Sequence, residues 1–542
     1  MASPSGLDPQ PLRFDAPASA SIPTAGHNHN HAMNNIHKKT HRSQAAWSIS
    51  SIKAVPSIFQ SFPVFPVFPV FPLPKPPTFL DFPLFPVNFL TSADNQRAAR
   101  ATFIGCGLES ERARWHRDGM AEGMARDVAA RILQKRERGE DFVENIAEKE
   151  LAAAALSGQD RSLAVELAYG CVRREGTLDF LIDRKTEGRT QKAGLRILLR
   201  LGLYQLFFLD RVPEHAAVHE TVELAKRLGF APQSGFVNAV LREYVRRRAE
   251  TKTLLNDLEK TKPWIALSHP EWLWKRWSER WGPDQALAQM RLNNESPAVF
   301  ARLNTLKGTH DELTALWQAE GVEFVGRQFD WAPLVFELKG HPPLGSLASF
   351  KKGLFYLQDA SALLAPKELG AQAGESILDL CAAPGGKTTF VAQLTSNQAT
   401  IVAEDVQPAR LALVRENAER LGAKIEIGNA APDRKFDRIL IDAPCSNTGV
   451  LRRRVDLRWR LQEKEIPRLA TIQLGLIDQA SRRLKPRGTI LYSTCSVEPD
   501  ENQAVVRKFI ESHPDFRIDF ERELIPYRDG VDGAFVARIV RA

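Results

Sequence analysis

Cysteine is scarce in this sequence: five occur among 542 residues, at positions 106, 171, 381, 445 and 495. They are too few and too widely spaced for a disulfide framework, and their spacing matches no zinc site. The sequence therefore predicts reduced thiols in a cytoplasmic protein that holds no metal.

A long unbroken apolar run is also missing. The most apolar stretch, FPVFPVFPVFPLPKPP, carries Pro63, Pro66, Pro69 and Pro72 at a period of three. Proline removes backbone donors and blocks a helix, so this stretch is not a membrane span, and polyproline II geometry suits it better. The N-terminus also lacks the charged and apolar regions of a secretory signal. We therefore expect no association with a membrane.

Residues 1–118 differ in composition from the rest of the chain. The segment GHNHNHAMNNIHKKTHR is rich in His and Asn. A metal-binding tract is one interpretation of it, but a disordered tail is the favoured one. We predict that residues 1–118 are a disordered extension rich in His, Asn, Pro and Phe. One hypothesis is that the natural start codon is Met120 or Met124, with mistranslated sequence or an organism-specific extension upstream.

No single sign of charge dominates. Lys and Arg number 73 against 65 Asp and Glu, which gives a net charge of +8 and an isoelectric point near 9.2. This excess favours a polyanionic partner only weakly, because many proteins are mildly basic.

Residues 124–250 carry a helical pattern throughout. Apolar residues recur at three- and four-residue steps in VAARIL, RSLAVELAYGCV and LRILLRLGLYQLFFL, with breakers at Gly188 and Pro213. We predict an all-α bundle in which Cys171 packs in the core. Basic residues that could contact phosphates are Arg173, Arg174, Lys226, Arg227 and Arg246–Arg248. A solvated basic face is an equally good interpretation of them.

The pattern of residues 251–350 predicts a linker helix and a small α/β subdomain. SHPEWLWKRWSERWG places four tryptophans, at 272, 274, 277 and 281, in one helical segment. This spacing favours a core or interface helix over a base-stacking surface. PAVFARLNTLKG then predicts a strand and THDELTALWQAEG a helix.

Residues 351–542 alternate strands with helices, which predicts a parallel, doubly wound α/β sheet that ends in a helix after Pro499. In ESILDLCAAPGGKTTFVAQL a strand leads through a glycine turn into a helix. The loop lacks the first glycine of a P-loop, because Leu380 and Cys381 occupy the positions five before Gly385 and Gly386, so a nucleoside triphosphate site is disfavoured. Asp405 follows the next strand, twenty residues after Gly385 in the sequence. An acid at this separation suits the hydroxyls of a ribose.

Five chemically active residues are predicted at or just past strand ends: Asp379, Asp405, Asp442, Cys445 and Cys495. The carboxyl ends of parallel strands meet at one edge of a sheet, where ligands bind. One such residue could lie there by chance, but core packing does not explain five that converge on one edge. We therefore expect one site beside a nucleoside-type cofactor.

Motifs in both halves resemble known families. LDLCAAPGGKTT, FDRILIDAPCSNTGVLRR and GTILYSTCSVEPDEN closely resemble the RNA 5-methylcytosine methyltransferases that use S-adenosylmethionine. RSLAVELAYGCVRR, RLGLYQLFFLDRVPEHAAVHETVELAKRLG and GFVNAVLR resemble the NusB-like RNA-binding domain. The resemblance implies an all-α NusB-like bundle at 124–250 and a Rossmann-like class I methyltransferase domain at 351–542.

The resemblance also implies a mechanism. Carbon 5 of cytosine is a poor nucleophile until a thiolate adds to carbon 6, and cysteine suits that attack. Cys495 of the TC pair would attack, and Cys445 of the PC pair would assist proton removal and product release. Asp442 would donate a hydrogen bond to nitrogen 3 of the ring, which requires a protonated carboxyl group with a raised pKa.

The cofactor residues are carried over from the same motifs. Those that would bind S-adenosylmethionine are Cys381, Ala382, Ala383, Pro384, Gly385, Gly386, Lys387, Asp405, Asn429 and Asp442. Two departures from the family pattern stand out. Asn429 occupies the position of an acid near the adenine, where its amide carbonyl can still accept a hydrogen bond. Arg454 and Val455 replace a His-Pro pair in a loop expected to contact RNA.

The implied substrate is small-subunit (16S) ribosomal RNA. Its target cytosine must be unstacked, so a single-stranded or loop region is expected. Arg452, Arg453, Arg454 and Arg458 are predicted to bind its phosphates. We expect a monomer. A transfer RNA substrate and an inactive RNA-binding assembly factor are the alternatives; the intact cysteines and aspartates argue against inactivity, and Asn429 is the one hint in its favour.

Overall fold

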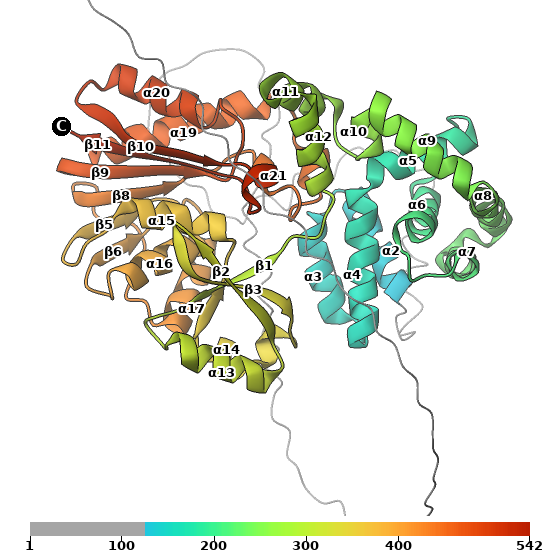
Figure 1. Ribbon diagram of the computed structural model, residues 1–542, viewed down its shortest axis with the longest axis horizontal. Coiled ribbons are helices and arrows are strands. Elements are labelled where there is room, and N and C mark those ends of the chain that lie inside the picture. The colour runs from blue at the N-terminus through green and yellow to red at the C-terminus, as the bar shows by residue number, and fades with distance from the viewer. Residues whose placement is uncertain (1–124) are drawn as a thin grey trace, which may run out of the picture. The chain divides into compact units, whose positions relative to one another are not determined.

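The computed structural model describes residues 125–542 (Figure 1). The predicted extension at 1–118, its proline-rich stretch and the two candidate start codons lie outside the described residues.

The first part of the described chain is helical, as predicted. Its elements are α2 (Ala125–Glu137), α3 (Val143–Ala153), α4 (Gly158–Arg173), α5 (Glu175–Thr186), α6 (Ala193–Phe208), α7 (Glu214–Ala225), η1 (Lys226–Phe230), η2 (Ala231–Gln233) and α8 (Ser234–Arg246). Helix α6 lies at the centre, because eleven of its sixteen residues are buried. A Cβ at Gly202 would lie 2.6 Å from the Leu241 side chain, so glycine lets α6 and α8 approach closely. Cys171 is a core residue, as predicted.

Four helices connect this bundle to the rest: α9 (Arg248–Thr261), α10 (Pro263–Ala266), α11 (Glu271–Trp281) and α12 (Pro283–Leu292). Helix α11 carries the tryptophans. Trp277 is fully buried in an apolar cluster that also contains Leu451, Leu457 and Val497 of the C-terminal part. The prediction of an interface helix is therefore confirmed.

A small antiparallel sheet follows, in the order β2-β3-β1-β4. Its strands are β1 (Val299–Leu303), β2 (Glu323–Phe329), β3 (Ala332–Gly340) and β4 (Phe355–Leu357), and its helices are α13 (His310–Glu320), η3 (Leu344–Ser346) and α14 (Ala348–Lys351). Thr309 and Glu312 form a capping box that begins α13. The predicted divisions near residues 250 and 350 stay predictions, because α11 and this sheet both pack against the C-terminal part.

The C-terminal part contains a seven-stranded sheet in the order β10-β11-β9-β8-β5-β6-β7. Its strands are β5 (Ser376–Asp379), β6 (Thr400–Ala403), β7 (Glu426–Ile427), β8 (Phe436–Asp442), β9 (Leu484–Thr494), β10 (Phe516–Leu524) and β11 (Ala534–Arg541). Strands β5 to β9 pair in parallel, whereas β11 is antiparallel to both β9 and β10. The sheet is mixed, which corrects the predicted all-parallel sheet. The predicted helix after Pro499 is present at Gln503–Ser512, but the chain does not end with it, because β10 and β11 follow. A short connection suffices for the antiparallel β10–β11 pair, so no crossover helix marks it in the sequence.

Helices cover both faces of this sheet. The helices of the C-terminal part are η4 (Ala360–Leu363), α15 (Leu364–Leu369), α16 (Gly386–Leu394), η5 (Pro408–Arg410), α17 (Leu411–Leu421), η6 (Thr448–Val450), α18 (Leu457–Arg460), α19 (Glu465–Arg482), α20 (Gln503–Ser512) and α21 (Pro526–Asp529). Ile377 and Leu440 pack with α15 and α16, while Leu378 and Ile439 pack with α19 and α20 on the other face (Figure 1). This alternation follows the two-residue period of a strand.

The strand order reverses between β5 and β8, which lie side by side. In a sheet of this type ligands bind at such a point, outside the carboxyl ends of the strands. None of the helices in residues 125–542 is both long and apolar enough to cross a membrane.

Candidate active site

Two cysteines lie side by side at the ends of neighbouring strands. Strands β8 and β9 are parallel with Asp442 opposite Ser493, so Cys445 and Cys495 follow shortly after the two strand ends. Their Sγ atoms are 3.4 Å apart. The Cys495 thiol also donates a hydrogen bond of 3.1 Å to Asn447 Oδ1. The predicted convergence of the two cysteines is confirmed.

The two thiols differ in their surroundings. Cys445 is 9% exposed, and burial, the hydrogen bond and charge of Cys495 and the charge of Glu501 raise its pKa well above the usual range. Cys495 is half-buried. A cavity of about 360 Å³ opens beside the strand ends, and its wall includes Cys495 but not Cys445. Cys445 is therefore a neutral thiol behind the cavity wall, and Cys495 is the sulfur a ligand can reach.

The predicted cofactor loop surrounds the start of α16. Gly385 has a φ of 101°, a conformation that favours glycine. A Cβ at Gly386 would lie 2.9 Å from the Tyr356 ring, so the backbone passes close to β4 there. All of the predicted loop residues from Cys381 to Lys387 line the cavity except Gly385.

A buried arginine that sequence reasoning missed supports this loop. Arg302 on β1 donates to Gly386 O at 3.0 Å and to Thr389 Oγ1 at 3.2 Å. Burial lowers its pKa to about 9. The small sheet therefore holds the first turn of α16 in place.

Asp442 is an acceptor in this structure. Its carboxylate receives hydrogen bonds from Lys387 Nζ at 2.7 Å and Ser493 Oγ at 3.1 Å. Burial lowers the pKa of Lys387, but the charge and hydrogen bond of Asp442 outweigh it and give a net rise. Burial raises the pKa of the nearby Asp379 to about 7. The Lys387–Asp442 pair thus offers its donor on Lys387, not on Asp442.

Asp405 lies just past the end of β6, where it was predicted, but its acceptor positions are in use. Arg410 Nη1 donates to Oδ1 at 3.1 Å and to Oδ2 at 2.9 Å. The backbone N–H groups of Gln407 and Ala383 donate at 3.0 Å and 3.3 Å. A carboxylate has about four acceptor positions, so a ribose would replace one of these donors. Neither Asp405 nor the exposed Asn429 is part of the cavity wall.

The helical domain supplies one side of the cavity. Its contributions are Glu144, Val165, Tyr169 and Arg173, of which sequence reasoning singled out only Arg173, as a phosphate contact. Glu144 is buried, and neither of its carboxylate oxygens has a hydrogen-bond partner. Burial raises its pKa to about 7. No local motif marks these residues, because only the packing of α3 and α4 against the catalytic part brings them here.

The predicted phosphate-binding arginines of the loop after β8 expose little surface and fall into two groups. Arg458 is fully buried and donates to Asn294 Oδ1 at 2.9 Å and to Asn293 O at 2.8 Å. Arg452 and Arg453 pair with Asp359 and Asp532. Arg454 is 7% exposed. Burial removes Arg458 from contact with an RNA backbone and so corrects that prediction, whereas Arg452, Arg453 and Arg454 line the cavity, where a phosphate contact stays a prediction.

The predicted basic residues of the bundle differ in burial and in partners. Arg173 is buried on the cavity wall. Those that form ion pairs with nearby carboxylates are Lys226, Arg227, Arg246, Arg247 and Arg248. Half-exposed pairs of this kind fit the alternative of a solvated basic face.

Comparison with known proteins agrees with this architecture. Three family models match in succession: the NusB family at residues 124–246, the ferredoxin-like domain of RsmF/B-like methyltransferases at 269–341, and 16S rRNA methyltransferase RsmB/F at 364–539. The crystal structure of PH0851 is 24% identical, covers 78% of this chain and 100% of that chain, and has a TM-score of 0.64. Fold and site together define an S-adenosylmethionine-dependent methyltransferase of the class I fold with a NusB-like domain.

Curated relatives narrow this class. The probable ribosomal RNA small subunit methyltransferase B of Bacillus subtilis is 33% identical, over 77% of this chain and 98% of its own length. The corresponding proteins of Erwinia tasmaniensis and, as a probable member, Synechocystis are each 35% identical over 77% of this chain. The chain belongs to the ribosomal RNA small subunit methyltransferase B family.

The site fits the cofactor of this family, S-adenosyl-L-methionine. The loop before α16 presents backbone groups and the helix N-terminus to the cavity, as a nucleoside or amino-acid ligand requires. In residues 125–542 no group of three or more His, Cys, Asp or Glu side chains could hold a metal ion.

Proposed function

We propose that this protein methylates carbon 5 of a cytosine in small-subunit ribosomal RNA through a covalent adduct on Cys495. The observation that carries the proposal is the pair of sulfur atoms 3.4 Å apart, of which only Cys495 faces the cavity beside the cofactor loop. A methyl transfer to oxygen or to an exocyclic nitrogen has no need for two adjacent thiols.

Each group has a step that suits its position. The thiolate of Cys495 adds to carbon 6 of the cytosine, which makes carbon 5 nucleophilic. S-Adenosylmethionine, held by the loop Cys381–Lys387, supplies the electrophilic methyl group. Solvent water takes the proton on carbon 5, the electrons of that C–H bond restore the double bond between carbons 5 and 6, and Cys495 leaves as a thiolate.

Cys445 serves the release step. With its raised pKa it carries a proton, and its sulfur lies within hydrogen-bond reach of Cys495. A neutral thiol donates a hydrogen bond to the departing sulfur but is a poor base for the proton on carbon 5. Of the two roles predicted for Cys445, the structure therefore favours product release.

The Lys387–Asp442 pair suits the polar edge of the base. The ammonium group of Lys387 can donate to nitrogen 3, which becomes more basic as the thiolate adds, and Asp442 can accept from the exocyclic amine. This assignment keeps the predicted place of Asp442 in the site and moves the donor to Lys387.

Two observations support the proposed RNA substrate: the burial of Cys495 and the names of the relatives. Cys495 is half-buried, so the cytosine must leave its stack to reach it, and a single-stranded or loop region permits this at least cost. The relatives named above act, by their names, on small-subunit ribosomal RNA. The helical domain that walls the cavity is expected to hold that RNA.

The test is product identification. The full-length protein is incubated with S-adenosylmethionine and unmethylated small-subunit ribosomal RNA, and the digested nucleosides are analysed by mass spectrometry. We expect 5-methylcytidine at one position, and no product with Cys495→Ala. A methylated base other than 5-methylcytidine, or equal methylation of transfer RNA, would contradict the proposal.

A further inference from the structure

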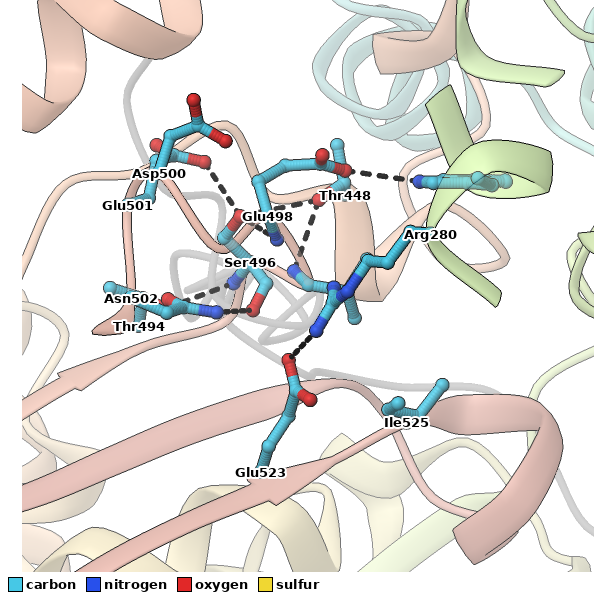
Figure 2. A network of polar contacts seen from close by, with 12 residues as sticks. Arg280, Thr448, Thr494, Ser496, Glu498, Asp500, Glu501, Asn502, Glu523 and Ile525 are labelled. Carbon is cyan, nitrogen blue, oxygen red and sulfur yellow. Dashed lines mark hydrogen bonds and ion pairs between the residues drawn. The ribbon is translucent and has the colours of Figure 1, made fainter. Parts of the chain in front are cut away.

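The loop after Cys495 carries two buried carboxylates that point in opposite directions. Figure 2 shows Glu498 directed toward helix α11 and Glu501 directed toward Ser496. Glu498 accepts a hydrogen bond of 3.0 Å from Trp277 Nε1 and pairs with Arg276, so it belongs to the interface of α11. Glu501 has different partners.

Glu501 joins the residues that directly follow the two cysteines. Its Oε1 atom accepts from Ser446 N at 2.8 Å and from Gln473 Nε2 at 3.1 Å. Its Oε2 atom accepts from Ser496 Oγ at 2.6 Å and from the Ser446 hydroxyl. One carboxylate therefore holds the loop after β8 and the loop after β9 at a fixed separation.

Asn502 fixes the same loop to its own strand. Its side chain accepts from Thr494 Oγ1 at 2.6 Å and donates to Ser496 O at 2.9 Å (Figure 2). Thr494 and Ser496, the two neighbours of Cys495 in the chain, are thus both hydrogen-bonded to Asn502. Hydrogen bonds on both sides of Cys495 therefore fix the backbone of this loop.

Glu501 holds its place without a cation. Within residues 125–542 no ion pair to Lys, Arg or His involves it, and four donors surround its two oxygens instead. The titratable groups that face it are Cys445 and Tyr492, and Arg454 faces Cys445 from the loop after β8. Burial raises the pKa of Glu501 to about 7, against the effect of its hydrogen bonds.

We propose that Glu501 is a positioning residue for the two-cysteine reaction: its buried carboxylate ties the two cysteine loops together and places a negative charge beside Cys445. The proposal rests on the function proposed above. The charge opposes ionisation of Cys445, so this cysteine stays a thiol while Cys495 is free to attack. It thereby assigns different roles to two chemically identical side chains.

The arrangement also predicts a dependence on pH. Protonation of Glu501 turns one acceptor into a donor. Protonation also removes the negative charge, so the hydrogen bonds from Ser446 N and Gln473 Nε2 lose the strength that a charged acceptor gives them. The tie between the loops therefore weakens as the pH falls below about 7.

The experiment compares Glu501→Gln with Glu498→Gln in the full-length protein. Both replace a fully buried carboxylate of the same loop by an amide, but only the Glu501 carboxylate accepts from the residues that follow the two cysteines, whereas that of Glu498 contacts α11. Iodoacetamide labelling at pH 6 to 9, without cofactor or RNA, is followed at each cysteine by mass spectrometry. We expect Glu501→Gln to raise the labelling rate of Cys445 relative to Cys495 at least threefold at pH 8, and Glu498→Gln to leave the ratio unchanged.

Two further variants keep the test decisive if either substitution prevents folding. Ser496→Ala removes one of the four donors and should shift the ratio in the same direction by less. Asp500→Asn, in an exposed carboxylate of the same loop, should leave it unchanged. An unchanged ratio in both Glu501→Gln and Ser496→Ala, or an equal shift in the controls, would overturn the proposal. Because labelling needs no methyl transfer, a shifted ratio without 5-methylcytidine would instead count against the proposed function alone.

Discussion

Replacing Arg458 with Met tests whether this arginine holds the domains together or binds RNA. Its guanidinium donates to Ser268 O at 3.2 Å, to Asn294 Oδ1 at 2.9 Å and to Asn293 O at 2.8 Å, with longer contacts to Arg173 O and Leu451 O. These acceptors come from the bundle, from the connecting helices and from the catalytic part. Arg458 therefore joins three stretches of the chain through one side chain.

The size of the effect follows from these bonds. A hydrogen bond contributes a net stabilisation of about 1 kcal/mol, so the three shorter ones contribute about 3 kcal/mol. The buried charge offsets part of this, because burial and the nearby Arg173 and Arg174 lower the pKa of Arg458. We expect Arg458→Met to lower the free energy of unfolding by about 2 to 3 kcal/mol.

Urea unfolding of the full-length protein measures this change. The matched control is Arg246→Met, whose side chain is 66% exposed and pairs with Glu243. A surface ion pair of this kind is worth less than about 1 kcal/mol. If Arg458→Met kept the stability of the wild type and reduced the slope of log affinity for RNA against log salt by about one, Arg458 would be a phosphate contact and this reasoning would be wrong.

Two further predictions concern buried acids. Burial raises the pKa of Glu144 from 4.5 to about 7, so the folded state retains a proton that the unfolded state has lost, and the free energy of unfolding falls as the pH rises through this window. Glu144→Gln should remove up to about 3 kcal/mol of that fall between pH 4.5 and 8, measured by urea unfolding at both ends; an unchanged pH dependence would contradict the burial of an unpartnered carboxylate. Asp405→Asn should raise the dissociation constant for S-adenosylmethionine about tenfold in isothermal titration, because the two acceptor positions of one amide oxygen are too few for Arg410, the two backbone N–H groups and a ribose. An unchanged constant would mean that Asp405 only holds Arg410.

Local patterns in the sequence were enough to predict the strand ends and the cysteine pair. Five polar or reactive residues end strands that the apolar pattern marks clearly, and parallel pairing then brings Cys445 and Cys495 together. The same reasoning located the tryptophan helix at an interface, because a helix with Trp277 on its apolar face must bury it.

Features that depend on packing between distant segments were not predictable. Arg452, Arg453 and Arg458 look like a basic loop in the sequence, and only the partners Asp359, Asp532 and Asn293 show that they are internal. The antiparallel pair β10–β11 lacks the crossover helix on which the prediction of a parallel sheet relied.

The hydrogen-bond partners of Asp442 were equally unpredictable from the sequence. The predicted mechanism needed Asp442 as a donor, but Lys387 and Ser493 both donate to its carboxylate. Which carboxyl group receives the Lys387 ammonium group is decided by side-chain geometry, and spacing in the sequence does not contain that information.

The most direct test of the central claim is to identify the sulfur that bonds to RNA. Cys445→Ala and Cys495→Ala proteins are incubated with S-adenosylmethionine and small-subunit ribosomal RNA, denatured, treated with nuclease and protease, and the peptides are analysed by mass spectrometry. The account predicts a methylated cytidine nucleotide attached to Cys495 in the Cys445→Ala protein, and no adduct in the Cys495→Ala protein. A nucleotide attached to Cys445 in the Cys495→Ala protein would contradict it.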